Sequence, residues 1–303
     1  MPKKIKTLII GLGRIGLKYD LYNNKILTHS KAIYKHPNFS LVGGVEKKSS
    51  LRAKFFKKYK TQSFIPNYKM YRNSNAELVV ISVNTSNHLR ILKNVLNLRN
   101  LKLILFEKPV GKSLSETQKI DSLCKKKLVK VVPNYIRLFD KETNRIKKII
   151  KSKFRSKFII EVLYNQNLQN NCSHMISLLL YWIGNLRSIK KIKKINKNNY
   201  HFTLIFKNCE ANFICKNKKR SKSQIKIIKK DYEILYKSDG EKIEYLNKKQ
   251  NKLRKVINYE YINKYQYNVY EHIYRNKKNN LFFEKLMVNA ISTQKIIEKI
   301  KNH

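Results

Sequence analysis

Short apolar runs alternate with amphipathic stretches through the first half of the chain. An apolar run of about four to eight residues predicts a strand, whereas apolar residues about three or four apart predict a helix face. Strands that are apolar throughout are typical of a parallel sheet covered on both faces by crossover helices. The first half is therefore expected to be an α/β domain, with strands at 5–10, 39–45, 76–83, 101–106 and 128–133 and helices at 29–37, 51–59, 88–98 and 115–127, together with a helical stretch after Gly16 that runs to about Leu21.

The pattern changes after about residue 140, where strands follow one another across short turns. Strands without helices between them predict an antiparallel or mixed sheet. We place two domains at 1–138 and 139–303, and the terminal helix 281–299 either stays with the second domain or packs back on the first. The remaining elements expected in this half are strands at 158–164, 200–206, 210–215 and 224–228 and a helix at 174–182.

A glycine-rich turn follows the first predicted strand. Gly11, Gly13 and Gly16 have the spacing G-x-G-x-x-G, with Arg14 and Ile15 between the last two. In this motif the first glycine permits a tight turn, the second leaves room for a diphosphate, and the third lets helix and strand approach closely. The helix N-terminus then offers N–H groups to the anion. The turn predicts dinucleotide binding.

Glu46 ends the second predicted strand, where a carboxylate can accept hydrogen bonds from the ribose hydroxyls of NAD and would repel the 2′-phosphate of NADP. Lys47 and Lys48 stand beside it and would tolerate that phosphate. The sequence therefore favours NAD, with NADP as the alternative.

Charge is the most unusual feature of the composition, with 67 Lys and Arg against 19 Asp and Glu and a formal charge of +48. Phosphate neutralisation drives nucleic-acid binding. Here, however, the excess is spread over both halves, and Lys greatly exceeds Arg, the residue that reads base edges. We expect solvated charged faces that attract anionic ligands and no specific nucleic-acid partner, with nucleic-acid binding as the alternative.

The four cysteines, at 124, 172, 209 and 215, form no CxxC pair. This spacing argues against a disulfide framework and against a zinc site, so we expect no metal. No apolar run approaches the ~20 residues of a membrane helix, and no signal-peptide cleavage site follows the first residues. We expect a soluble, cytoplasmic protein without a membrane partner.

Several motifs resemble those of the glucose–fructose oxidoreductase / inositol dehydrogenase / MocA (Gfo/Idh/MocA) family. The resemblance implies an N-terminal Rossmann domain and a C-terminal α/β domain whose largely antiparallel open sheet joins homo-oligomers. It also implies hydride transfer between a nicotinamide cofactor and a secondary alcohol or carbonyl of a sugar, cyclitol or sugar derivative. The motifs are GLGRIG (11–16), Thr28-His29, ISVNTSNH (81–88), FEKPVG (106–111), NYIRLFD (134–140) and NNCSHMISLLLYWIG (170–184).

The resemblance assigns catalytic roles to Lys108 and His174. The Lys108 ammonium would stabilise charge on the reacting oxygen, and the His174 imidazole would act as general acid and base. In the family the bond before Pro109 is often cis. Cofactor contacts are implied for the matching residues Thr85, His88, Glu107, Lys108, Pro109 and Asn134.

Substrate contacts are implied for Arg137, Asn170 and Asn171, together with Lys108 and His174. Arg137 either binds a substrate carboxylate or phosphate or pairs with Asp140. Asn170 stands where the family often has Asp, and Cys172 stands where Gly is usual; without an adjacent base we interpret Cys172 as a structural thiol. These departures support a second hypothesis, a catalytically impaired nucleotide-binding sensor or regulator.

Overall fold

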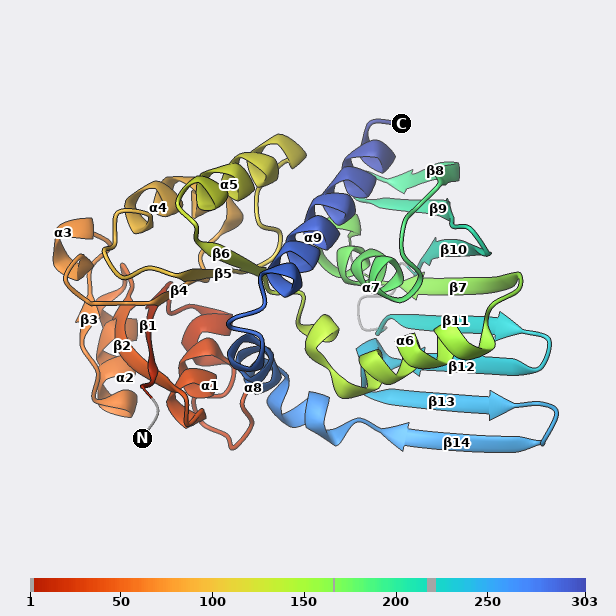
Figure 1. The fold of residues 1–303 in the computed structure, drawn as a ribbon, viewed down its shortest axis with the longest axis horizontal. Helices are drawn as coiled ribbons and strands as arrows, with labels where there is room; N and C mark the ends of the chain where they lie inside the picture. Colours follow the sequence, from red (N-terminus) through yellow and green to blue (C-terminus); the bar gives the residue numbers. More distant parts are fainter. Residues whose placement is uncertain (1–2, 166, 217–221) are drawn as a thin grey trace. The chain divides into compact units, whose positions relative to one another are not determined.

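The structure is a computed structural model that describes residues 3–165, 167–216 and 222–303. It divides into two compact units, one of residues 1–136 with 263–291 and one of residues 137–262 with 292–303 (Figure 1). The chain thus returns to the first unit near its end. The sequence analysis placed 139–303 in one domain and left open whether the helix 281–299 packs back on the first. Packing accounts for the return, because Tyr270 lies edge-on against Phe39 with ring centroids 5.3 Å apart, and Ile26 N donates to Asn263 O at 2.7 Å.

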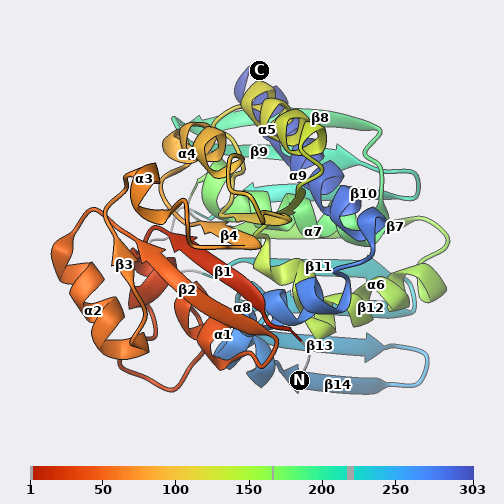
Figure 2. The same cartoon turned by 60° about the vertical axis from the view of Figure 1, so that its left-hand side comes forward.

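The first unit is built on a six-stranded parallel sheet with the order β3-β2-β1-β4-β5-β6. Figure 2 labels β1, β2, β3 and β4 of this sheet. The order reverses beside β1, and this switch point is where open α/β sheets bind ligands. The predicted strands, parallel sheet and α/β class are confirmed. The strands are β1 (Ile5–Ile10), β2 (Phe39–Val45), β3 (Ser63–Phe64), β4 (Leu78–Ile81), β5 (Leu103–Phe106) and β6 (Lys130–Pro133), and the helices are α1 (His29–Lys35), α2 (Ser49–Tyr59), α3 (Tyr68–Tyr71), α4 (His88–Val95) and α5 (Leu114–Lys126).

The helix expected from Gly16 to about Leu21 is the clearest difference within this unit. Only a π-helical turn forms in this region, η1 (Arg14–Lys18), in which Leu17 N and Lys18 N both donate to Gly13 O. Asp20 ends it, because its buried carboxylate accepts from Leu27 N, Thr28 N and the Thr28 hydroxyl at 2.6–2.8 Å. Local hydrogen bonding by an Asp side chain thus competes with continuation of the helix.

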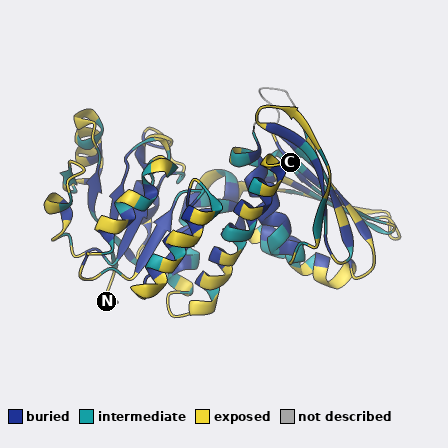
Figure 3. Cartoon of the chain, turned by 90° about the horizontal axis from the view of Figure 1, so that it is seen from above, coloured by how far each residue is buried: buried dark blue, intermediate teal, exposed yellow. Residues whose placement is uncertain are grey.

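The second unit carries an eight-stranded sheet with the order β14-β13-β12-β11-β7-β10-β9-β8. Among the described strands of this sheet, only β7 and β10 pair in parallel, so the predicted mixed, mostly antiparallel sheet is confirmed. The helices α6 (Lys141–Lys153) and α7 (Ser173–Ile183) cover one face of it (Figure 3). The strands are β7 (Phe158–Tyr164), β8 (Ser188–Asn196), β9 (Asn199–Ile205), β10 (Cys209–Cys215), β11 (Gln224–Lys229), β12 (Tyr232–Lys237), β13 (Lys242–Asn247) and β14 (Lys252–Ile257).

The two units share their last helices. The unit boundaries fall inside α8 (Tyr259–Arg275) and α9 (Asn280–Lys301). The sequence analysis predicted α9, as 281–299, and did not predict α8. Four lysines, at 190, 191, 193 and 194, lie in β8, an edge strand that the sequence analysis did not predict. Lysines on an edge strand oppose pairing with another chain, which gives a physical reason for the run.

Candidate dinucleotide site and substrate residues

The three glycines of the turn after β1 differ in what surrounds them. A Cβ atom at Gly11, whose φ is +102°, would lie 2.7 Å from Ser82 O, and a Cβ atom at Gly16 would lie 2.1 Å from Gly11 O. The packing of the protein itself therefore requires these two glycines. A Cβ atom at Gly13 would meet no atom of the described chain within 4 Å, and its φ of −73° lies outside the left-handed region. Protein packing does not explain glycine there, whereas room for a ligand does.

The end of β2 is tied to the same turn. Glu46 Oε2 accepts from Leu12 N at 2.9 Å, and Oε1 accepts from Lys48 N at 3.1 Å. A carboxylate has about four acceptor positions, so both oxygens keep capacity for hydroxyl donors. Arg52 Nη1 donates to the carbonyl oxygens of Glu46 and Lys47 at 2.8 and 2.7 Å. A carboxylate and a guanidinium group therefore lie at the same strand end.

The loop after β4 faces the glycine turn through Ser82, whose hydroxyl donates to Gly11 O at 2.7 Å. Thr85 begins a short 3₁₀ turn and is partly exposed. The His88 ring is fully buried, with Nδ1 2.9 Å from Val110 O and Nε2 3.1 Å from Val83 O. Burial lowers the pKa of His88, despite these carbonyl groups. Both ring nitrogens thus face protein carbonyls and link two loops of the site instead of facing a ligand.

The Glu-Lys-Pro turn begins directly after β5. Glu107 N donates to Ile81 O at 3.0 Å, and the Lys108–Pro109 peptide bond is cis. Burial alone would raise the pKa of the Glu107 carboxyl, but the hydrogen bonds from His29 and Asn134 and the charge of the Lys108 ammonium hold it below its usual range. The turn thus places a carboxylate and a partly buried lysine together at the carboxyl end of the sheet.

Asn134 follows β6 and points its amide group into the site. Its Nδ2 donates to Glu107 Oε1 at 2.6 Å and to Gln266 Oε1 at 3.2 Å. Its Oδ1 is buried and meets no donor within the part of the chain that the structure describes. An unmatched buried acceptor costs about 1–3 kcal/mol, and the carboxamide N–H of a nicotinamide is a donor that would satisfy it. The residues present therefore fit a nicotinamide dinucleotide at two places, Gly13 and Asn134.

Arg137, a predicted substrate residue, is buried in the second unit. Its Nε donates to Asp239 O at 3.1 Å, and its Nη2 lies 3.3 Å from Asp239 Oδ1. Asp140 is used elsewhere: Oδ2 accepts from Thr143 N at the start of α6, and Oδ1 accepts from Asn258 Nδ2, both at 3.0 Å. The structural partner of Arg137 is thus Asp239 and not Asp140.

The predicted residues around His174 also lie in the second unit. Leu168–Cys172 form a π-helical turn, η4, that leads into α7. Asn167 Oδ1 accepts from Asn170 N at 2.7 Å, and Ser173 Oγ donates to Asn170 O at 3.0 Å. His174 is buried, Asn170 is exposed and Asn171 is partly exposed.

Cys172 is fully buried with a free thiol, and burial raises its pKa well above the usual range. A buried neutral thiol is a poor nucleophile, in keeping with a structural role. Because Lys108 and His174 lie in different units, their meeting at one substrate stays a prediction.

Comparison with known proteins finds a family match within the first unit. Residues 5–135 match the Gfo/Idh/MocA model, described as an oxidoreductase family with an NAD-binding Rossmann fold. Among curated proteins, no sequence matches the chain significantly.

Solved structures share the fold over nearly the whole chain. A dehydrogenase (MviM) from Clostridium difficile is 20% identical, with a TM-score of 0.78 and 99% of both chains covered. An oxidoreductase from Agrobacterium radiobacter, in complex with NAD⁺, L-tartaric acid and magnesium, is 11% identical, with a TM-score of 0.75 and 98% and 95% covered. The transcriptional regulator Gal80p from Kluyveromyces lactis is 15% identical, with a TM-score of 0.80 and 99% and 90% covered. The same fold thus carries both dehydrogenases and a regulator.

The described residues contain no group of three or more His, Cys, Asp or Glu residues arranged to hold a metal ion. None of the helices within 3–165, 167–216 and 222–303 combines the length and apolar character needed to cross a membrane.

Sequence reasoning missed two residues beside the Glu-Lys-Pro turn, Gln266 and Tyr270, which contact His29. The two residues are four positions apart, so on a helix they lie on the same face, and this spacing was the signal in the sequence that could have identified them as a pair.

Proposed function

We propose that the protein is an NAD-dependent oxidoreductase that transfers a hydride to or from a secondary alcohol or carbonyl carbon of a sugar, cyclitol or sugar derivative. The observation that carries the proposal is the unfilled space at Gly13, in a turn whose other two glycines are explained by packing. The unmatched acceptor of Asn134 supports it at the other end of the site. The match of residues 5–135 to an NAD-binding oxidoreductase family supports the reaction class.

Each residue of the site has a chemical role in this proposal. The glycine turn holds the diphosphate, Glu46 accepts from the ribose hydroxyls, and Asn134 orients the nicotinamide, which supplies the hydride acceptor or donor. The Lys108 ammonium donates to the substrate oxygen and stabilises its negative charge. His174 takes the hydroxyl proton during oxidation and returns it during reduction.

Titration with NADH, followed by turnover assays with a panel of sugars and cyclitols, tests the function. We expect NADH fluorescence to change on binding, because the nicotinamide ring moves from water into the binding site of the protein. We also expect at least one polyol to give steady NAD⁺ reduction. The absence of dinucleotide binding would refute the proposal.

Cofactor choice gives a separate prediction. We expect NADH to bind about 10-fold more tightly than NADPH, a difference of about 1.4 kcal/mol, because Glu46 repels a 2′-phosphate. Glu46→Gln keeps an acceptor for Leu12 N but removes the negative charge. The variant should therefore show a smaller difference between its affinities for NADH and NADPH. Parallel fluorescence titrations with both cofactors measure the ratio. If the unaltered protein bound NADPH more tightly than NADH, this prediction would be wrong, and Arg52 rather than Glu46 would determine the choice of cofactor.

A regulator that binds the cofactor without turnover is the second candidate. Asn170 favours it, because an amide cannot stabilise an imidazolium as a carboxylate would. The resemblance of the fold to Gal80p shows that such a fold also occurs in a transcriptional regulator. Dinucleotide binding with no turnover on any polyol would support this candidate, and steady turnover would exclude it.

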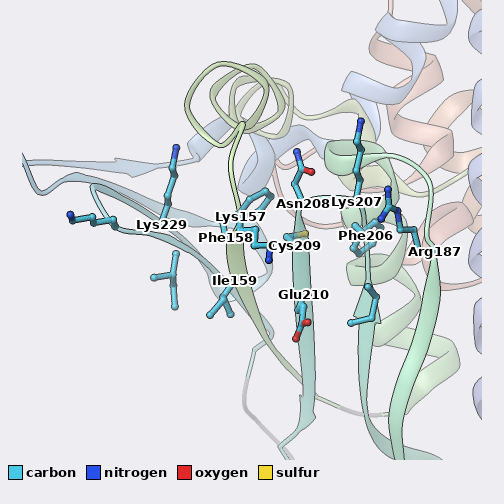
Figure 4. A pocket seen from close by; sticks show the side chains of 13 residues that line it. Lys157, Phe158, Ile159, Arg187, Phe206, Lys207, Asn208, Cys209, Glu210 and Lys229 are labelled. Atoms are coloured by element: carbon cyan, nitrogen blue, oxygen red, sulfur yellow. The ribbon is translucent and has the colours of Figure 1, made fainter.

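We also propose that the uncovered face of the second-unit sheet joins copies of the chain. Strand register places seven charged residues of β7 and β10–β13 on this face, four acidic and three basic, in a chain with 67 basic and 19 acidic residues. Ile159 and Ile214 are exposed on the same face. A hollow of about 590 Å³ at one end has the outward-facing residues Ile159, Ile205 and Ile228 in its lining (Figure 4). Balanced charge and exposed apolar groups are suited to contact between identical surfaces.

Light scattering tests this interface. We expect the unaltered protein to be an oligomer and Ile214→Asp to dissociate it, because the substitution places a charge in an apolar contact. Leu128→Asp is the matched control, since Leu128 is 90% exposed and lies in the first unit. A monomeric unaltered protein would contradict the prediction.

A further inference from the structure

A buried polar network surrounds Glu107 within the first unit. His29 Nε2 lies 3.0 Å from Glu107 Oε1, and its Nδ1 lies 2.8 Å from the Tyr270 hydroxyl and 3.1 Å from Gln266 Nε2. Asn134 connects the two sides, because its amide nitrogen contacts both Glu107 Oε1 and Gln266 Oε1. His29, Gln266 and Tyr270 are fully buried, whereas 18% of the Glu107 side chain is exposed to solvent. The network thus joins α1 and α8 to the Glu-Lys-Pro turn.

The direction of each hydrogen bond follows from the Glu107 carboxylate. A carboxylate only accepts, so Asn134 must present its NH₂ group to it, and the same group then donates to Gln266 Oε1. Gln266 therefore turns its own NH₂ group toward His29 Nδ1, which must accept. The ring proton is left on Nε2, where it donates to Glu107 Oε1.

We propose that His29 is a positioning residue: its Nε2–H tautomer, fixed by Gln266 and Tyr270, holds the Glu107 carboxylate in one orientation beside Lys108. Both hydrogen bonds from His29 and Asn134 end on Oε1, and Glu107 keeps 18% of its side chain exposed. A fixed anion next to Lys108 restricts where the ammonium group can lie. The inference rests on the proposed catalytic role of Lys108, and it assigns α8 a part in the chemistry.

Two substitutions at His29 test the positioning. His29→Leu removes the donor, whereas His29→Gln keeps an N–H group at a similar reach. We expect His29→Leu to lower kcat about 10- to 100-fold, as small displacements of a reacting group do, with the Kd for NADH near its unaltered value. His29→Gln should restore most of kcat. Equal losses in both variants, or no loss in either, would overturn the inference.

Nuclear magnetic resonance of the unliganded protein separates this inference from the proposed function. We expect the ¹⁵N shifts of His29 to show a protonated Nε2 and an unprotonated Nδ1. Carbon-13 titration of Glu107 should show a higher pKa in His29→Leu, because burial remains while a donor is lost; Lys108, His88 and Tyr270, the other titratable groups that interact with Glu107, are unchanged. A protonated Nδ1, or an unchanged Glu107 titration, would overturn the inference even in an active enzyme. If the protein turned over no polyol, the proposed function would be refuted. The ¹⁵N shifts of His29 and the titration of Glu107 would still test the positioning role of His29.

Discussion

Gly13→Ala is expected to remove dinucleotide binding while leaving the fold as stable as before. The added methyl group meets no protein atom, so the free energy of unfolding should stay within about 0.5 kcal/mol of the unaltered value. In the proposed function the same methyl group enters the space of the diphosphate. We expect the affinity for NADH to fall at least about 100-fold, or about 2.8 kcal/mol. Fluorescence titration and a thermal melt of the same sample measure the two effects.

Gly16→Ala is the matched control, because it adds the same methyl group three residues away. That methyl group would lie 2.1 Å from the carbonyl oxygen of Gly11, a backbone atom that cannot turn aside. We expect a loss of about 1–3 kcal/mol of stability, as in overpacked cores, and a lower melting temperature. If Gly13→Ala bound NADH normally, the open space at Gly13 would have no relation to the cofactor. The proposed function would then lose its main support.

The parallel sheet of the first unit could be predicted because its strands are apolar throughout and stand between turn residues. The same reasoning failed where polar side chains determine the structure. Asp20 ends the expected helix after Gly16 through three hydrogen bonds to backbone and hydroxyl groups of residues 27 and 28, a contact that periodicity does not register. In β8, lysines occupy a strand because only one side of it is paired. In both places hydrogen bonding overrides the apolar pattern.

The candidate site was predictable to the extent that its residues follow the carboxyl ends of parallel strands. Gly11, Glu46, Glu107 and Asn134 all follow such strands, and the structure brings them to one edge of the sheet. The sequence could not show that both ring nitrogens of His88 contact backbone carbonyl oxygens. Nor could it show that a helix more than 120 residues beyond Asn134 supplies Gln266 to the same network. Such contacts depend on tertiary packing between distant segments, for which a single sequence holds no direct record.

Lys108→Met is expected to lower turnover about 10²- to 10⁴-fold, the range associated with loss of a group that stabilises charge or moves a proton. Methionine has a similar length and no charge, so the Glu-Lys-Pro turn should keep its shape. The Kd for NADH should stay close to the unaltered value, because the diphosphate is held at the glycine turn. Steady-state kinetics with the best polyol of the panel, together with NADH titration, measure both quantities.

Lys112→Met provides the control for net charge, since Lys112 lies exposed four residues further along the same segment. If the positive charge of the protein acted only by attracting the anionic cofactor, both variants would lose the same amount of affinity for NADH. A specific role at the reacting oxygen would affect kcat in Lys108→Met alone. Unchanged kcat in Lys108→Met would mean that another group stabilises the oxygen, and the positioning role of His29 would fall with it, whereas dinucleotide binding at Gly13 would stand. The two glycine variants and the two lysine variants therefore test binding and chemistry independently.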